Sequence, residues 1–386
     1  MTRLTEWSWI QRFAEQFAAC GVGAGDTAVV VCERASRPSL VETSRLALAS
    51  VGAAVVVVEA TTPANRGPVP IRSTGASIAV AGNKATIAAC SAADFVADCT
   101  VEGLLHAPEL GAILAGGARV LMISNEHPEV FERMPNDPGL QAVVERAATA
   151  LGLATTMHVT SAAGTDLTIS LTGAMCAGSS GVTSGPGTIA HWPGGLVVAF
   201  PAARSVNGTL VLDVGDVNLT FKEYVRSPIT CTVVDDHIIT VDGDGLDRDL
   251  LASYLSAWDE REAYAVSHVG WGLNPHCRWD VLPLYDKADL NGTELRAFAG
   301  NFLFSTGANE VAGRFCRGHL DLPMRNCSVS LDGRLVVDSG TVVDSATVVD
   351  SATVVDSATV VDSATVVDSG VVIDAEPGSV RSFGTE

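Results

Sequence analysis

The chain is poor in positive charge, with 24 Lys and Arg residues against 44 Asp and Glu, a formal net charge of −20 over 386 residues. A protein that binds a nucleic-acid backbone needs surplus Lys and Arg to neutralise phosphates. The charge balance therefore argues against a nucleic-acid partner. Six of the aspartates belong to one repeat near the C-terminus, and they stand at positions 338, 344, 350, 356, 362 and 368.

Long hydrophobic runs and paired cysteines are also missing. No uncharged apolar stretch is long enough to cross a bilayer, and the segment from Met1 to Trp7 has no apolar signal-peptide core. The nine cysteines form an odd set without a Cys-x-x-Cys pair. Such a set fits reduced, buried thiols better than a disulfide framework or a zinc cluster. We therefore expect a cytoplasmic protein with no membrane partner.

Strand and helix patterns alternate in the first part of the chain. Apolar residues at helical spacing predict helices over about 6–20 and 39–50. A β-branched run predicts a buried strand over 27–32, and a second apolar strand is expected over 53–58. Strand, helix and strand at this spacing indicate a parallel βαβ unit. The further elements expected are a strand over 77–81, a helical stretch over 84–98, a strand over 119–124 and a helix over 140–151.

These patterns predict that residues 1–154 form an open α/β domain with a parallel sheet. The glycine-rich segment from Gly21 to Gly25 does not follow a strand and does not match G-x-G-x-x-G. A dinucleotide site is therefore not expected.

The pattern changes after Ala154, where short strand-like runs follow one another. One helix is predicted, over about 247–258. We expect residues 155–337 to form an α+β domain rich in antiparallel strands. The predicted strands cover 156–159, 167–171, 196–200, 209–214, 217–221, 229–234 and 237–241.

An acidic repeat follows, because Val-Val-Asp-Ser-(Ala/Gly)-Thr recurs six times between Val336 and Ser369, with the last Thr replaced. The even period keeps the strand phase from copy to copy, which would suit a small β-helix. The repeats lack the large apolar residues that fill such a helix. We therefore prefer a loosely ordered appendage and treat 338–386 as an acidic hexapeptide-repeat tail.

The most informative motif is Gly318-His319-Leu320-Asp321, which lies in a segment that reads as a strand. Residues i and i+2 of a strand point to one side, so His319 and Asp321 project together. They offer a nitrogen and an oxygen ligand to a divalent metal, and His268 is the best candidate for a third. Two histidines and one carboxylate are typical of non-haem Fe(II) oxygenases. A hydrogen-bonded surface pair is the alternative interpretation.

The other histidines divide into two groups. His106 and His191 lie in segments that read as loops, flanked by glycine and proline, and either could serve as an acid–base group. A structural role is the alternative for both. Of the remaining four, His127 reads as a residue at the start of a helix, and His158 and His237 read as structural residues in strands. His276 fits a loop position or a place beside the metal ligands equally well.

Two segments resemble the 2,5-dihydroxypyridine 5,6-dioxygenases, bacterial enzymes of nicotine and nicotinate breakdown. They run from His268 to Pro275 and from Gly318 to Cys327, and the resemblance extends from near the N-terminus to about Val337. It implies an Fe(II) held by His268, His319 and Asp321. It also implies that His106 and His191 lie near the substrate, and that the protein is a homo-oligomer.

The resemblance implies a reaction as well. Hydroxypyridine and O2 would be the substrates, and opening of 2,5-dihydroxypyridine between C5 and C6 would give N-formylmaleamate. His106 or His191 would take the proton of the 5-hydroxyl. Asn274 and Arg325 could orient ligands or substrate, and turn or strand-edge hydrogen bonding is the alternative role for these two.

Two other functions stay open. The fold resemblance reaches metallo-aminopeptidases, which hold two metals and have a tyrosine ligand seven residues after the first histidine. Pro275 occupies that position here and cannot be a side-chain ligand, so a single metal is preferred over a metal-dependent aminopeptidase-like hydrolase. A non-catalytic protein that assembles through its acidic repeat is the third possibility.

Overall fold

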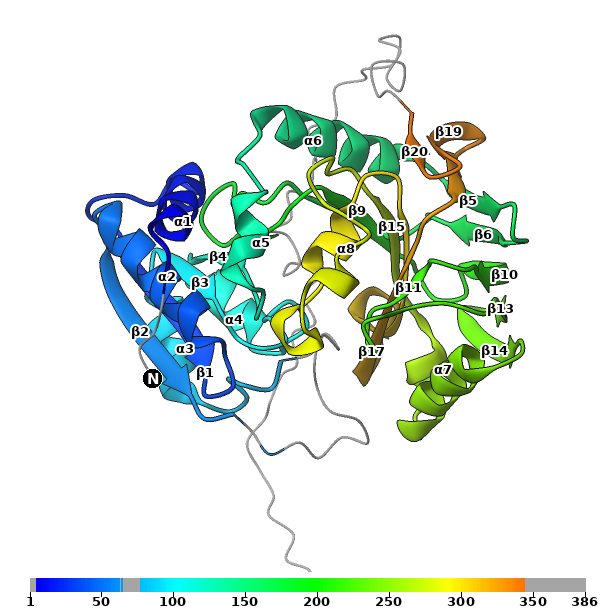
Figure 1. Ribbon diagram of the computed structural model, residues 1–386, viewed down its shortest axis with the longest axis horizontal. Helices are drawn as coiled ribbons and strands as arrows, with labels where there is room; N and C mark the ends of the chain where they lie inside the picture. The colour runs from blue at the N-terminus through cyan, green and yellow to red at the C-terminus, as the bar shows by residue number, and fades with distance from the viewer. Residues whose placement is uncertain (1–4, 63, 65–76, 344–386) are drawn as a thin grey trace, which may run out of the picture.

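The computed structural model describes residues 5–62, 64 and 77–343. Its first half, drawn in blue and cyan on the left of Figure 1, is built on a five-stranded sheet of order β2-β1-β3-β4-β8 in which every pair is parallel. The parallel α/β prediction is confirmed for this part. The strands are β1 (Thr27–Glu33), β2 (Ala54–Ala60), β3 (Phe95–Asp98), β4 (Arg119–Met122) and β8 (Ile189–His191).

Helices cover both faces of this sheet, because alternate side chains of a strand point to opposite sides. Val30 of β1 packs in one cluster with Phe13 and Leu40, whereas Val31 packs in another with Cys90 and Ile113. The first cluster lies under α1 (Trp7–Ala19) and α2 (Pro38–Ser50), and the second under α3 (Lys84–Ser91) and α4 (Leu110–Ala115). β1 is buried on both faces, which explains its continuous valine run, whereas Val56 and Val57 of β2 are exposed.

Two expectations for this half are wrong. Residues 77–81 form a turn and not a strand, and the stretch 84–98 is the helix α3 followed by the buried strand β3. Phe95 to Asp98 is too short to show a period of its own, so the sequence pattern does not separate this strand from the helix before it. The structure places β8 in the parallel sheet although it lies beyond residue 154.

Antiparallel sheets dominate the second half, as predicted. One has eight strands in the order β14-β13-β10-β6-β5-β18-β19-β20, and the other has five in the order β17-β16-β15-β9-β7. β11 (Val217–Asn218) and β12 (Glu223–Tyr224) form a separate pair. The eight are β5 (Thr156–Ser161), β6 (Asp166–Ser170), β10 (Val206–Leu212), β13 (Ile229–Val234), β14 (His237–Asp242), β18 (Cys327–Leu331), β19 (Arg334–Asp338) and β20 (Thr341–Val342), and the five are β7 (Met175–Ser179), β9 (Leu196–Phe200), β15 (Val266–Gly272), β16 (Phe302–Asn309) and β17 (Arg314–Met324).

The two large antiparallel sheets share one hydrophobic core. Leu320 and Phe304 of the five-stranded sheet belong to the same buried cluster as Val159 and Leu210 of the eight-stranded sheet. Two helices, α6 (Pro138–Leu153) and α7 (Leu246–Ala257), add residues to that cluster. The core therefore occupies one face of the five-stranded sheet and leaves its other face for the site described below.

Several contacts join the halves, which lie side by side in Figure 1 with α8 (Thr293–Ala297) between them. The Glu126 carboxylate accepts hydrogen bonds from the backbone N–H groups of residues 291–293, and Arg133 after α5 (Pro128–Glu132) makes an ion pair with buried Glu294. α6 packs on β7 and β9. These contacts cross the boundary predicted at residue 154. The division of the chain at that residue stays a prediction.

The first copy of the acidic repeat is part of the fold. β19 and β20 form a tight hairpin in which Ser339 and Gly340 have positive φ. Val342 and Val343 begin the second copy, and the rest of the repeat lies outside the described residues. None of the nine cysteines forms a disulfide, and all except half-buried Cys176 are buried, as expected.

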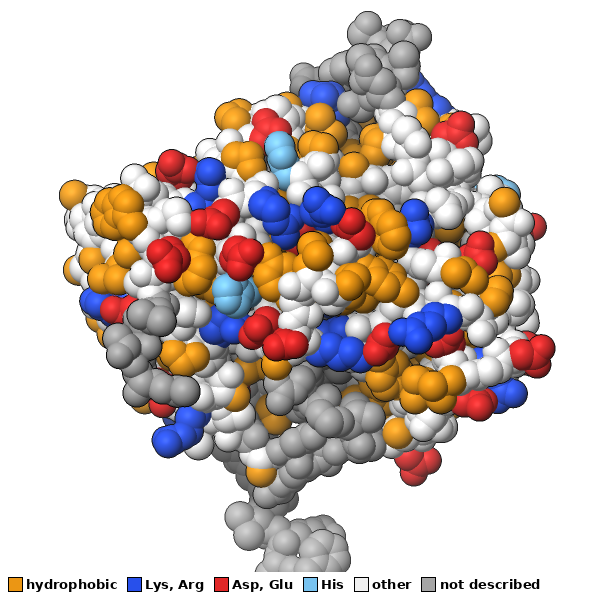
Figure 2. Space-filling model, viewed as in Figure 1, with side chains coloured by type: hydrophobic (Ala, Val, Ile, Leu, Met, Phe, Trp, Pro, Cys, Tyr) orange, Lys and Arg blue, Asp and Glu red, His pale blue; other side chains and the backbone are white. Residues whose placement is uncertain are grey.

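The surface agrees with the acidic but mixed composition. Acidic and basic side chains lie interspersed on the face shown in Figure 2. No helix in the described ranges is both long enough and apolar enough to cross a membrane.

Candidate metal centre

His268, His319 and Asp321 project from one face of the five-stranded sheet. Asp321 of β17 pairs with Ser305 of β16, and its carboxylate accepts a hydrogen bond from the Ser305 hydroxyl. In β15, Val269 pairs with Phe304 of β16, and His268, the residue before Val269, reaches the same face with its Nε2 3.8 Å from Asp321 Oδ1. The strand phase predicted for His319 and Asp321 is confirmed, and the upstream segment supplies the third side chain.

The donor atoms of these three residues converge. Asp321 Oδ1 lies 3.2 Å from His319 Nε2 and 3.8 Å from His268 Nε2. Ligands in neighbouring positions of an octahedral ion, each about 2.1 Å from it, lie about 3.0 Å apart. All three residues are buried, with at most 6% of their surface exposed.

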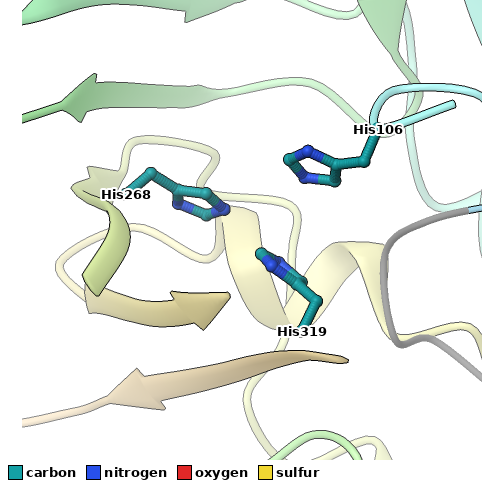
Figure 3. A group of neighbouring side chains, drawn as sticks. All are labelled: His106, His268 and His319. Carbon is teal, nitrogen blue, oxygen red and sulfur yellow. The ribbon is translucent and has the colours of Figure 1, made fainter. Parts of the chain in front are cut away.

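His106 joins the group from the other half of the molecule (Figure 3). It lies in the loop between β3 and α4, at the carboxyl ends of the parallel strands, where α/β proteins bind ligands. Its ring centroid is 4.8 Å from that of His319 and 6.3 Å from that of His268. Ring nitrogens of all three histidines lie within 4.8 Å of one another.

These residues fit a divalent metal. On both His268 and His319 the Nε2 atom faces Asp321 Oδ1, while the Nδ1 atom is buried with no hydrogen-bond partner among the described residues. Two donor sets are close enough: the predicted His268, His319 and Asp321, and the three histidines. The first is favoured because its carboxylate offsets part of the charge of a divalent ion and approaches the Nε2 atoms most closely.

Arg296, in the last turn of α8, controls the charge of Asp321. Its Nε donates a hydrogen bond to Asp321 Oδ2 over 2.5 Å. Burial alone would raise the pKa of Asp321, but Arg296 and the two imidazoles hold it well below its ordinary value. Asp321 is therefore ionised and turns Oδ1 toward the histidines.

Burial also favours the neutral form of the imidazoles of His106, His191 and His268. It lowers the pKa of His268 to about 3 and that of His106 well below its ordinary value. The pKa of His191 falls to about 4, through burial and then through the Arg296 charge. Neutral imidazoles can bind a metal or accept a proton at neutral pH.

His191 lies at the end of β8 and not in the loop that the sequence predicted. The glycines around it produced the wrong assignment, because a three-residue strand shows no alternation of its own. Its backbone N–H donates to the Ser179 hydroxyl, and its Nε2 is buried without a hydrogen-bond partner in the described part of the chain. His106 and His191 line the same small cavity of about 60 Å³ as the three proposed ligands.

Gly318 shows why the local sequence is constrained. A Cβ at this position would lie 2.8 Å from the Trp258 indole ring, so only glycine lets β17 pack against Trp258 next to His319. The Tyr254 hydroxyl donates to the His319 carbonyl over 2.7 Å and fixes the strand from the same side.

The other residues singled out have structural contacts. The Asn274 amide donates to the Gly194 carbonyl and its oxygen accepts from His276 N–H, so it fixes a turn. The Arg325 guanidinium lies 3.6 Å from the centre of the Trp279 ring. His127 caps α5 as expected, and His158 and His237 lie in strands β5 and β14.

Three residues with roles at the site were missed. Arg296 and Ser305 contact Asp321, and Asp98 holds the loop that carries His106 by accepting from Thr100 and Leu104. No motif marks them. Only the β16–β17 register could have placed Ser305 opposite Asp321.

The fold and the buried cluster of histidines beside Asp321 define a candidate metalloenzyme. Comparisons with known proteins identify the family. A model of the family described as 2,5-dihydroxypyridine 5,6-dioxygenase matches residues 8–344. The chain belongs to this family, as its sequence motifs predicted.

A sequence comparison and a structure comparison with Pseudomonas putida KT2440 support the assignment. A protein described as 2,5-dihydroxypyridine 5,6-dioxygenase is 42% identical over 265 residues, which cover 68% of this chain and 74% of the relative. A solved structure of the 2,5-dihydroxypyridine dioxygenase from that strain gives a TM-score of 0.82 at 36% identity, covering 87% of this chain and 97% of the other.

A more distant structure shares the fold. Wild-type AmpT from Thermus thermophilus gives a TM-score of 0.58 at 13% identity, covering 87% of this chain and 99% of that one. At this identity the likeness concerns the fold alone.

Proposed function

We propose that this protein is an Fe(II)-dependent dioxygenase that opens 2,5-dihydroxypyridine between C5 and C6 with O2 and releases N-formylmaleamate. Membership of the family supports the reaction. The convergence of His268 Nε2, His319 Nε2 and Asp321 Oδ1 on one sheet face is the observation that carries the proposed metal site.

Each side chain has a role in holding the ion. The two imidazoles would donate their Nε2 lone pairs, and Asp321 would donate Oδ1 while Arg296 keeps Oδ2 engaged. Fe(II) bound there would supply open neighbouring positions for a substrate oxygen and O2.

His106 and His191 would manage protons. The 5-hydroxyl of the substrate loses a proton to become an electron-rich oxyanion, and a neutral imidazole beside it can take that proton. His191 Nε2 has no hydrogen-bond partner among the described residues and is one acceptor, and a ring nitrogen of His106 is the other. Both oxygen atoms of O2 enter the product, so no further reductant is needed.

A metal-dependent aminopeptidase-like hydrolase is the alternative, because AmpT has a similar fold. The structure offers such an enzyme one candidate metal cluster within the described ranges, and Pro275 stands where a tyrosine ligand would be required. A dinuclear site is therefore disfavoured.

Anaerobic loading with Fe(II), followed by 2,5-dihydroxypyridine and then air, tests the proposal. Loss of the ultraviolet band of the substrate is expected, with about one iron bound per chain. His319→Ala should lose the iron, whereas His106→Gln should keep it and turn over slowly. Full iron retention in His319→Ala would refute the ligand assignment. Peptide hydrolysis with Zn(II) or Co(II) in place of ring opening would favour the hydrolase.

A further inference from the structure

A second, larger cavity adjoins the proposed metal site. Its volume is about 810 Å³, against about 60 Å³ for the cavity that contains the proposed ligands. Six residues line both cavities: Leu105, His106, His191, Leu196, Val198 and Phe200.

The interior of the larger cavity is apolar. Leu110 and Leu114 of α4 line one side, and Ile189 of β8 and Met175 of β7 line another. The first three are no more than 6% exposed. Apolar cavities of several hundred Å³ are typical of sites for ligands much larger than one small ring.

Charge gathers where this cavity meets solvent. Glu260, Glu310 and Arg317 are exposed and line that side, next to Phe315, which is 75% exposed. Among the described residues that line this side, two carboxylates and one guanidinium give a net negative charge. An anionic group would therefore lose its hydration among aliphatic side chains without a surplus of positive charge to replace it.

A dihydroxypyridine ring at the proposed metal site would leave the larger cavity unfilled. We propose that the site also accepts 2,5-dihydroxypyridines that carry an uncharged apolar substituent at ring carbon 3 or 4, and that the larger cavity holds this substituent. This proposal rests on the proposed function. Cleavage between C5 and C6 leaves carbons 3 and 4 intact, so the substituent passes unchanged into the product.

Ala177 is the position at which the cavity can be filled from its wall. A Cβ on Gly178 would meet Val144 and Ala148 of α6, so the neighbouring side chains of β7 point to the opposite side, toward the cavity. Ala177→Phe should occupy the space that the substituent needs. Leu114→Phe fills it from α4, and Ala163→Phe, at an exposed turn, is the matched control.

Binding to the Fe(II)-loaded wild-type protein without oxygen gives the first test. The Kd of 4-butyl-2,5-dihydroxypyridine should be about tenfold or more below that of the parent compound, because each buried methylene strengthens binding. The 4-carboxy compound should bind about tenfold more weakly than the butyl compound. Equal Kd values for the butyl and parent compounds would overturn the proposal.

Turnover gives the second test. The ratio of kcat/KM for the butyl compound to kcat/KM for the parent should fall about tenfold or more in Ala177→Phe and in Leu114→Phe, but not in Ala163→Phe. A ratio unchanged in both cavity variants would overturn the proposal. Absence of parent turnover in the wild type contradicts the proposed function instead, while tighter binding of the butyl compound would still support the cavity assignment.

Discussion

Asp321 is held from two sides while its Oδ1 faces two imidazoles. Arg296 donates to Oδ2, and Ser305 donates to Oδ1 across the β16–β17 pair. Partners behind a metal ligand fix its orientation and its charge, and their loss commonly costs about 10- to 100-fold in metal affinity. Arg296 is therefore a positioning residue for the proposed metal site.

Arg296→Met should weaken Fe(II) binding by about 10- to 100-fold at pH 7. Removal of the guanidinium raises the pKa of Asp321, so the pH at which half the sites bind metal should move upward. Metal titration at several pH values measures both effects. Arg325→Met is the matched control, because that guanidinium stacks on Trp279. Equal metal affinity in the two variants would contradict this role.

Activity should persist at lower pH than an ordinary histidine base allows. A base works when unprotonated, and burial lowers the pKa of His191 to about 4 and that of His106 well below its ordinary value. Protonation then begins only as the pH falls through about 5. The acid limb of kcat/KM against pH should therefore lie below pH 6. A half-maximal point near pH 6.5, the ordinary histidine value, would show that the base is not buried in this way.

Loops and strand ends bring the site together at the scale of elements. β17 and β15 carry the proposed ligands, whereas His106 comes from the β3–α4 loop. Asp98, the last residue of β3, stabilises that loop: it accepts from Thr100 N–H and Oγ1 and from Leu104 N–H, at 2.7 to 3.0 Å.

Asp98→Asn should displace His106 without affecting the proposed ligands. The amide cannot accept all three hydrogen bonds, so we expect a loss of about 1–3 kcal/mol in the free energy of unfolding at pH 8. kcat/KM should fall about tenfold with iron content unchanged. Denaturant unfolding, steady-state kinetics and metal analysis measure these three quantities. Asp94→Asn, just before β3, should leave the free energy of unfolding, kcat/KM and iron content unchanged. Loss of iron in Asp98→Asn would contradict the proposed division of roles.

The same elements show what sequence reasoning could reach. β17 and the His319–Asp321 phase were predictable because alternation and glycine placement are local. β3 and β8 were not, since four and three residues are too short for a period. The contacts of Arg296, Ser305 and Asp98 depend on strand register and on loop paths, which separate parts of the chain decide together.

The whole molecule joins a parallel half to an antiparallel half, and the site lies where they meet. The acidic repeat contributes β19 and β20 to the eight-stranded sheet, and the part of it after Val343 lies outside the described residues. Homo-oligomer formation and a cytoplasmic location stay predictions. Light scattering of the purified protein measures the first.

Truncation after Val343 should leave turnover unchanged. The deletion keeps β20 and every residue assigned to the site. The expected result is a kcat/KM within about twofold of the full chain, a change below about 0.4 kcal/mol. If the truncated protein lost its assembly and its activity together, the acidic repeat would be a functional element and not an appendage.

The position of the iron decides between the two possible donor sets. Crystals grown with Fe(II) under anaerobic conditions, with anomalous scattering measured on both sides of the iron absorption edge, locate the ion. We predict one iron peak per chain, bonded to His268 Nε2, His319 Nε2 and Asp321 Oδ1, with His106 beside it and unbonded. A peak bonded to His106, His268 and His319 with Asp321 turned away would contradict the proposed ligand set.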